Sequence, residues 1–261
     1  MFLLSMVRLS GLYSCIVMVG CGDGINVFTI SDDIELGIQV RDEIAANPQD
    51  YPILDEALYP DAYLSLYDVR DAILGSGQVE YADRFDWETY IIDDDETLNA
   101  FCAPGGYIYV YSGLMRFLEY EDELAGVMGH EIAHAANRHS TQQLTKMYGI
   151  AVLIDLVLDD GTAASTIAEI AGALVNLSFS RSDETESDAS SVRYLCETHY
   201  AADGAAGFFE KLENNGFPEF LSTHPSSDTR IHDIRSTAAA QGCSVEYGSK
   251  EGYQMFLDSL P

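Results

Sequence analysis

The chain has 261 residues, with 13 Lys and Arg against 43 Asp and Glu, so its formal net charge is −30. It has no basic cluster that would neutralise phosphates, which argues against nucleic acid as a partner. The apolar residues are evenly spread and no Pro-, Gly- or Ser-rich linker interrupts them, so we expect one globular domain, residues 21–261, behind a short leader.

The leader has the features of an export signal. Arg8 is its only charge and precedes the apolar run LSGLYSCIVMVGC, which is shorter than the roughly 20 residues that cross a bilayer. The ending MVGC resembles a bacterial lipoprotein signal, in which residues 1–20 are removed and Cys21 is lipidated. Met18 stands where Leu is usual, so a plain secretory signal is the alternative. Translation from Met6 is a second option for the start.

Two helices and two strands are predicted in the first half of the chain. SDDIELGIQVRDEIAAN has helical apolar spacing with Ser31 as the cap, and a second helix follows from about Pro60 to Leu74. WETYIIDDD alternates as a strand does and stops at the acidic run 93–95. APGGYIYVYSG predicts another strand, with one face formed by Tyr107, Tyr109 and Tyr111 and the other by Ile108 and Val110.

From Glu121 onward the pattern is helical almost throughout. The most apolar stretch, 150–177, is interrupted by Asp155, Asp159 and Asp160, so it lacks a continuous run of membrane-spanning length. We expect a buried helical hairpin around Gly161, with contact at a membrane interface as the alternative.

Three cysteines remain once the leader is removed: Cys102, Cys196 and Cys243. Export permits a disulfide, and Cys196 with Cys243 is one candidate pair. Buried free thiols are the other interpretation, and the sequence leaves both open.

GHEIAHAANRHS, residues 129–140, contains the pattern His-Glu-x-x-His. In a helix, His130 and His134 lie one turn apart on one face, where two imidazoles reach the same metal ion. Glu131 projects about 100° around the helix, near enough to contact a water on that metal. Two imidazole ligands and a neighbouring carboxylate are what a hydrolytic zinc site requires. Two surface histidines are the alternative.

A catalytic zinc needs a third protein ligand and one open position. One known arrangement requires Gly at position 137 and His at position 140, where this chain has Asn137 and Ser140. His139 is out of register for that arrangement, so we interpret it as a polar residue near the helix end. The third ligand must therefore come from another segment.

SRSDETESDASSVRYLCETH supplies the candidate. As a helix it carries Glu184 and Asp188 on the same face as its apolar residues, with Glu186 on the opposite side. Glu184 is the expected third ligand, and Asp188 is placed to orient a ligating imidazole. His199 lies about 22 Å further along such a helix and cannot hold the same ion. An acidic first turn stabilised by the helix dipole is the alternative.

Four segments in this order resemble a zinc metallopeptidase family, the one that includes HtpX-type membrane proteases, CAAX prenyl proteases, the Oma-type mitochondrial stress protease and periplasmic lipoproteins of the BepA and LoiP kind. They are NAFCAPGGYIYVYSGLM, EDELAGVMGHEIAHAANRHS, SRSDETESD and THPSSDTRI. The resemblance implies an α+β, mainly helical zincin-like domain, with a small β-sheet whose edge strand flanks the active site. It also implies a Glu-x-x-x-Asp pattern with the third ligand first, which falls on Glu184 and Asp188. Ser187 departs from the Ala that is common in the family.

The resemblance gives further residues a role. In such peptidases an edge strand binds extended substrate through its main chain, which places Asn99, Gly105, Gly106 and Ile108, within Asn99 to Val110, at the substrate. An ordinary strand with turn glycines is the alternative. His224 and Arg230 would lie near the metal. Either of them would stabilise the oxyanion, or His224 would occupy the open position and hold the enzyme latent.

Together these features predict a metalloendopeptidase with one Zn²⁺ per chain, held by His130, His134 and Glu184. Glu131 would act as general base on a water whose pKa the metal lowers towards about 7. We expect a lipid-anchored periplasmic protein of a Gram-negative bacterium, on the outer rather than the inner membrane, that cleaves misfolded or unassembled envelope proteins. The alternatives are a zinc-binding chaperone or assembly factor that does not cut, and a latent interaction protein.

Overall fold

The computed structural model describes residues 26–158, 164–215, 220–225 and 229–261. The predicted leader with Cys21, and Gly161 of the predicted hairpin, lie outside these residues.

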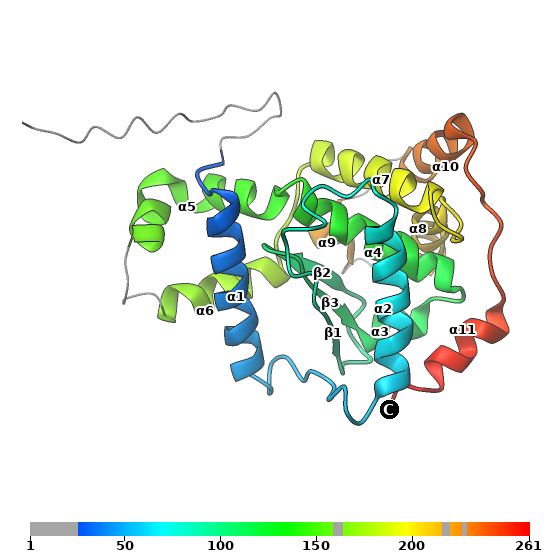
Figure 1. Ribbon diagram of the computed structural model, residues 1–261, viewed down its shortest axis with the longest axis horizontal. Coiled ribbons are helices and arrows are strands. Elements are labelled where there is room, and N and C mark those ends of the chain that lie inside the picture. The colour runs from blue at the N-terminus through cyan, green and yellow to red at the C-terminus, as the bar shows by residue number, and fades with distance from the viewer. Residues whose placement is uncertain (1–25, 159–163, 216–219, 226–228) are drawn as a thin grey trace, which may run out of the picture.

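The described part of the chain is mainly helical around one small sheet, so the predicted α+β class is confirmed (Figure 1). The helices are α1 (Ile30–Ala46), α2 (Pro60–Gly75), α3 (Ser112–Phe117), α4 (Glu121–Ala136), α5 (His139–Leu158), α6 (Ala164–Val175), α7 (Arg181–Cys196), α8 (Gly204–Asn215), α9 (Phe220–Thr223), α10 (Arg230–Gln241) and α11 (Lys250–Leu257). The strands are β1 (Thr89–Ile92), β2 (Ala100–Ala103) and β3 (Tyr107–Tyr111). Their order is β1-β3-β2, with β3 parallel to β1 and antiparallel to β2.

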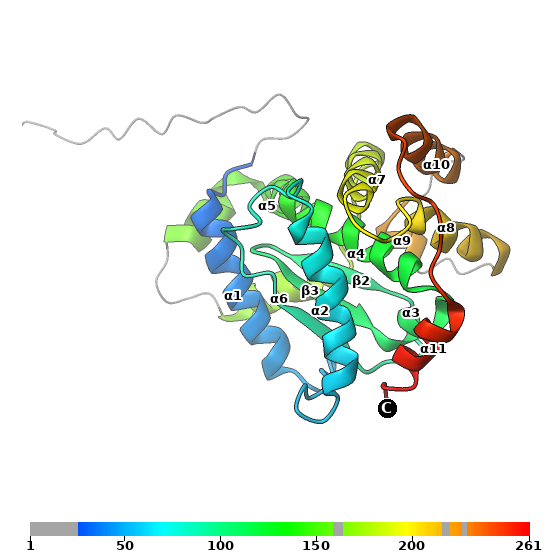
Figure 2. The ribbon, with the colours of Figure 1, turned by 45° about the vertical axis from the view of Figure 1, so that its right-hand side comes forward.

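The two faces of the sheet belong to two apolar clusters. The three tyrosines of β3 pack with α1 and α6, while Ile108 and Val110 pack with α2 and α4, as the alternation in the sequence predicted. Figures 1 and 2 show α1, α5 and α6 on one side of the sheet, with α2, α4 and the later helices on the other. Helix α4 lies in the interior, against β2, α2, α7 and α8.

The strand predicted at APGGYIYVYSG is β3, but Asn99 to Val110, expected to form one edge strand, is a hairpin of β2 and β3. Ile108 lies in the central strand, opposite Thr89 on one side and Cys102 on the other. Its main chain is therefore inside the sheet, and the edge strand of this hairpin is β2. Gly105 and Gly106 form the turn, with φ of 78° and 92° that side chains other than glycine rarely adopt.

Helix α1 begins two residues earlier than its sequence indicated. Thr29 is the cap instead of Ser31, because its hydroxyl accepts from the backbone N–H of Asp32 while the Asp32 carboxylate accepts from that of Thr29. The second predicted helix is confirmed as α2.

A close approach of two helices fixes the position of α4. A Cβ added at Gly126 would lie 2.1 Å from the backbone nitrogen of Ala205 at the start of α8. Only glycine permits this contact, so α4 and α8 pack backbone against backbone.

Cys196 and Cys243 form a disulfide, which joins the end of α7 to the segment after α10. Cys102 is a buried free thiol. The bond thus ties together two helices that contribute residues to the site described below, α7 and α10.

Helices α5 and α6 lie on either side of residues 159–163. None of the helices within the described residues is both long enough and apolar enough to cross a bilayer.

Candidate metal centre

Helix α4 brings His130, Glu131 and His134 into the interior, where all three side chains are buried. The carboxylate of Glu123 accepts from the backbone N–H groups of Glu119 and Tyr120, which caps the first turn of the helix. Nε2 of His130 and Nε2 of His134 lie 3.0 Å apart. The four-residue spacing therefore produces the convergence of two imidazoles that it predicted.

Helix α7 supplies two carboxylates. A capping box between Ser180 and Asp183 starts the helix, so Glu184 follows one turn inside it. Glu184 is 2% exposed, whereas the side chain of Glu186 is 60% exposed on the opposite side, as the helix-face argument predicted. Asp188 is also buried, one turn after Glu184.

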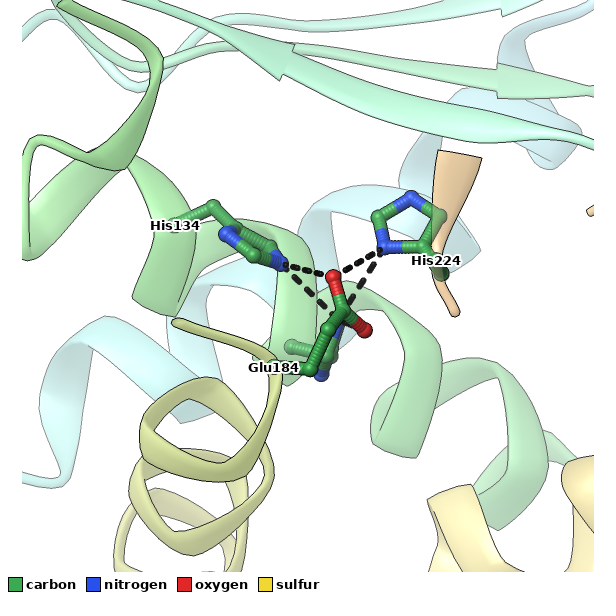
Figure 3. Close-up of side chains that lie close together, drawn as sticks. His134, Glu184 and His224 are labelled. Carbon is green, nitrogen blue, oxygen red and sulfur yellow. Dashed lines mark hydrogen bonds and ion pairs between the residues drawn. The ribbon is translucent and has the colours of Figure 1, made fainter. Parts of the chain in front are cut away.

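His224, directly after α9, completes the cluster. Its Nδ1 lies 3.2 Å from Oε1 of Glu184 and 3.3 Å from Nε2 of His130. Figure 3 shows the carboxylate of Glu184 between the imidazoles of His134 and His224. The ring of Phe220 stacks on that of His224 at 4.5 Å between centroids and fixes its orientation.

The donor atoms fit a zinc ion. One atom from each of His130, His134, Glu184 and His224 lies within 4.8 Å of the others. Tetrahedral zinc with bonds of about 2.0–2.1 Å separates its ligand atoms by about 3.3 Å. Nε2 of His130 and Nε2 of His134 are 3.0 Å apart, and each lies 3.4 Å from an oxygen of Glu184, Oε2 for His130 and Oε1 for His134. Imidazole nitrogens and a carboxylate oxygen are donors that zinc accepts.

Glu131 lies beside this cluster without belonging to it. Its Oε1 is 3.5 Å from Nε2 of His224 and has no hydrogen-bond donor among the described residues. Burial raises the pKa of Glu131, although His224 and His130 act in the opposite direction. The side chain is a buried carboxylate with an unused acceptor, which is the property a general base needs.

Asp188 and Arg230 surround the metal-ligating groups. Oδ1 of Asp188 is 2.9 Å from Nδ1 of His130, as the role predicted for Asp188 requires. Arg230 bonds both oxygens of Asp188, at 2.7 and 2.8 Å, and lies 2.9 Å from Oε2 of Glu184. Its guanidinium also lies over the ring of Phe209, at 3.6 Å from the centroid.

These charges set the protonation of the site. Burial raises the pKa of Glu184, but His224 and His130 outweigh it and hold that pKa well below its usual value. Burial lowers the pKa of His130, but the carboxylates of Glu184 and Asp188 raise it to about 9. Burial lowers the pKa of His134 well below its usual value. The pocket thus favours positive charge next to Glu184, which a bound metal would also supply.

His139 lies near a helix end, as the sequence indicated, because α4 ends at Ala136 and α5 begins at His139. It is buried, and its Nδ1 lies 3.0 Å from Nδ1 of His134. Phe179, which no motif indicated, stacks on the His134 ring at 3.9 Å. His199 is exposed at the end of α7, away from the cluster.

The residues expected to bind substrate lie in two places. Asn99 is buried immediately before β2, and its side chain donates to the backbone carbonyl of Val175 and accepts from the N–H of Ala100. Gly105 and Gly106 are in the hairpin turn, where a Cβ at Gly106 would lie 2.9 Å from the ring of Trp87. The turn and the close packing therefore explain why glycine occupies both positions. Within this hairpin, the edge strand β2 packs on α4.

The chain matches the model of peptidase family M48 over residues 69–238, which is more than half of its length. It is 34% identical over 147 residues to the mitochondrial metalloendopeptidase OMA1 of Arabidopsis thaliana, covering 55% of this chain and 30% of that protein. It is 29% identical over 171 residues to the β-barrel assembly-enhancing protease of Yersinia pestis (59% and 35%), and 28% identical over 180 residues to that of Escherichia coli K12 (63% and 37%). The chain spans about a third of the length of these relatives.

Proposed function

The chain belongs to peptidase family M48, a family of zinc metallopeptidases, and on this premise we propose that it is a zinc-dependent endopeptidase. One observation supports this most strongly: the ligand cluster of His130, His134, Glu184 and His224 lies beside the buried carboxylate of Glu131. A metal site that only stabilises the fold does not require such a carboxylate.

In the proposed mechanism, His130, His134 and Glu184 hold the metal, and Asp188 fixes the ring of His130 through Nδ1. A zinc ion held there would supply Lewis acidity for the scissile carbonyl oxygen and for water. Glu131 takes a proton from the attacking water and returns it to the leaving amine. The substrate lies extended along β2, which is the edge of the sheet next to α4.

We propose that this conformation is latent. A catalytic zinc keeps one coordination position open, whereas His224 here completes a set of four donors. Nη1 of Arg230 lies 3.5 Å from the backbone carbonyl of His224, so displacement of His224 would release this nitrogen towards a developing oxyanion. The movement of His224 would then both open the fourth coordination position and make Arg230 available to stabilise the oxyanion.

Replacing His224 by alanine is expected to raise casein cleavage while zinc stays bound, because three ligands remain and the fourth position becomes open. Turnover and zinc content are measured for the variant, the parent and His232→Ala, which removes an exposed histidine. Lost cleavage with zinc retained would instead make His224 a catalytic group, and the latent state would be abandoned.

Removal of the metal tests the proposed reaction itself. Casein cleavage by the purified chain should stop in the presence of a zinc chelator and return when Zn²⁺ is added in excess of the chelator. Cleavage that continues at full rate after the zinc has been removed would rule out the proposed chemistry.

The place of action is proposed from the leader and the disulfide. We propose that Cys21 is lipidated and anchors the domain in the periplasm, at the outer membrane. The Cys196–Cys243 bond supports an oxidising compartment, where disulfides persist. The names of two relatives concern β-barrel assembly, so we propose misfolded or unassembled envelope proteins as the substrates.

A further inference from the structure

We propose that His139 is a positioning residue that holds His134 in the orientation and tautomer for binding the metal. This inference rests on the proposed zinc site, but it concerns a residue outside the ligand cluster. His139 is 3% exposed, and its Nδ1 lies 3.0 Å from Nδ1 of His134.

The direction of the hydrogen bond follows from the position of each nitrogen. Nε2 of His134 faces the cluster, at 3.0 Å from His130 and 3.4 Å from Oε1 of Glu184. A metal-binding nitrogen needs its lone pair, so the proton of the neutral ring is on Nδ1. That Nδ1–H donates to His139, which must accept through its own Nδ1.

Acceptance at Nδ1 fixes the tautomer of His139 as well. Its proton is then on Nε2, which lies 3.4 Å from Oε2 of Glu186. The hydroxyl of Ser187 also lies near Nδ1 of His139, at 3.3 Å, but the single lone pair of that nitrogen accepts from the closer His134. The contacts therefore run from His134 to His139 and from His139 to the carboxylate of Glu186. A carboxylate is a common hydrogen-bond acceptor in the outer shell of a metal-ligating histidine.

The backbone places His139 where this contact forms. Arg138 has φ of 62°, in the left-handed region, and this ends α4 before the chain turns into α5. The Arg138 guanidinium is fixed by the buried carboxylate of Asp33, at 2.5 and 3.1 Å, and by the carbonyl of Phe28. Helix α1 thus holds the turn that directs His139 back onto His134.

Zinc affinity, measured on the purified chain by competition with a chromogenic chelator, tests this role. His139→Ala should bind zinc about 10- to 100-fold more weakly, the usual cost of losing an outer partner. His139→Asn keeps an acceptor near the place of Nδ1 and should recover most of the affinity. His139→Phe keeps a ring of similar width without an acceptor and should stay weak even if the alanine variant does not fold. His232→Ala is the matched control and should equal the parent.

Parent-like affinity in His139→Phe would overturn the proposal, and so would an asparagine variant as weak as the phenylalanine one, because packing alone would then explain the residue. The measurement is independent of cleavage. A parent that binds zinc but cuts no protein would refute the proposed endopeptidase and leave the role of His139 to be decided by the variants.

Discussion

Replacing Glu131 by glutamine should lower the turnover number for casein by roughly 100- to 10,000-fold, the usual contribution of a general base. Glutamine has the same size but cannot take a proton from water. Because Glu131 lies outside the group of donor atoms, the variant should retain zinc at the parent level. Oε1 of Glu131 makes no hydrogen bond within the described residues, so the contact that the substitution weakens there is the 3.5 Å approach to Nε2 of His224.

Glu121→Gln, in the first turn of the same helix, is the matched control, and it should cleave as the parent does. Zinc content is measured on each sample, so that a loss of metal is not mistaken for a loss of catalysis. If Glu131→Gln with zinc bound cleaved casein at the parent rate, the proposed mechanism would be wrong. A zinc-binding chaperone that does not cut would then be the better interpretation.

The second large effect is expected from Glu184→Ala. The variant should bind zinc more than about 100-fold more weakly, since loss of an outer partner alone costs 10- to 100-fold. It also removes one of the two carboxylates that contact Arg230, the one at 2.9 Å, and leaves this buried cation with Asp188 alone, which is destabilising. Cleavage should therefore fall with the zinc.

Two measurements that start from the metal-free protein separate these consequences. Chelator competition gives the loss of zinc affinity, and thermal unfolding gives the loss of stability. Glu197→Ala, an exposed glutamate at the end of α7, is the control. Parent-like zinc affinity in Glu184→Ala would exclude Glu184 as a ligand. It would leave the three histidines as the metal-binding set.

The part of the site that lies on single helices could be predicted from the sequence. The spacing of His130 and His134 and the face shared by Glu184 and Asp188 depend only on the 3.6-residue repeat of a helix. The structure shows both arrangements, because each pair of residues lies inside one uninterrupted helix, α4 or α7. The resemblance to a family had placed His224 near the metal, but its 3.2 Å contact with Glu184 depends on a loop 40 residues away.

The contact between His139 and His134 could not be predicted by the same argument. Counting at 100° per residue assumes that the helix continues, but α4 ends at Ala136 and Arg138 is in the left-handed region. The separate strand β2 was not predicted, for a related reason. Strand β2 has only four residues, all buried, so it carries no alternation that would separate it from β3.

We propose that this chain has one zinc site formed by His130, His134, Glu184 and His224. Native mass spectrometry of the purified chain, after incubation with a small excess of Zn²⁺ and removal of the unbound metal, tests it most directly. We predict a mass that exceeds that of the denatured chain by one zinc ion. A native mass equal to that of the bare chain would contradict the claim and the mechanism that depends on it.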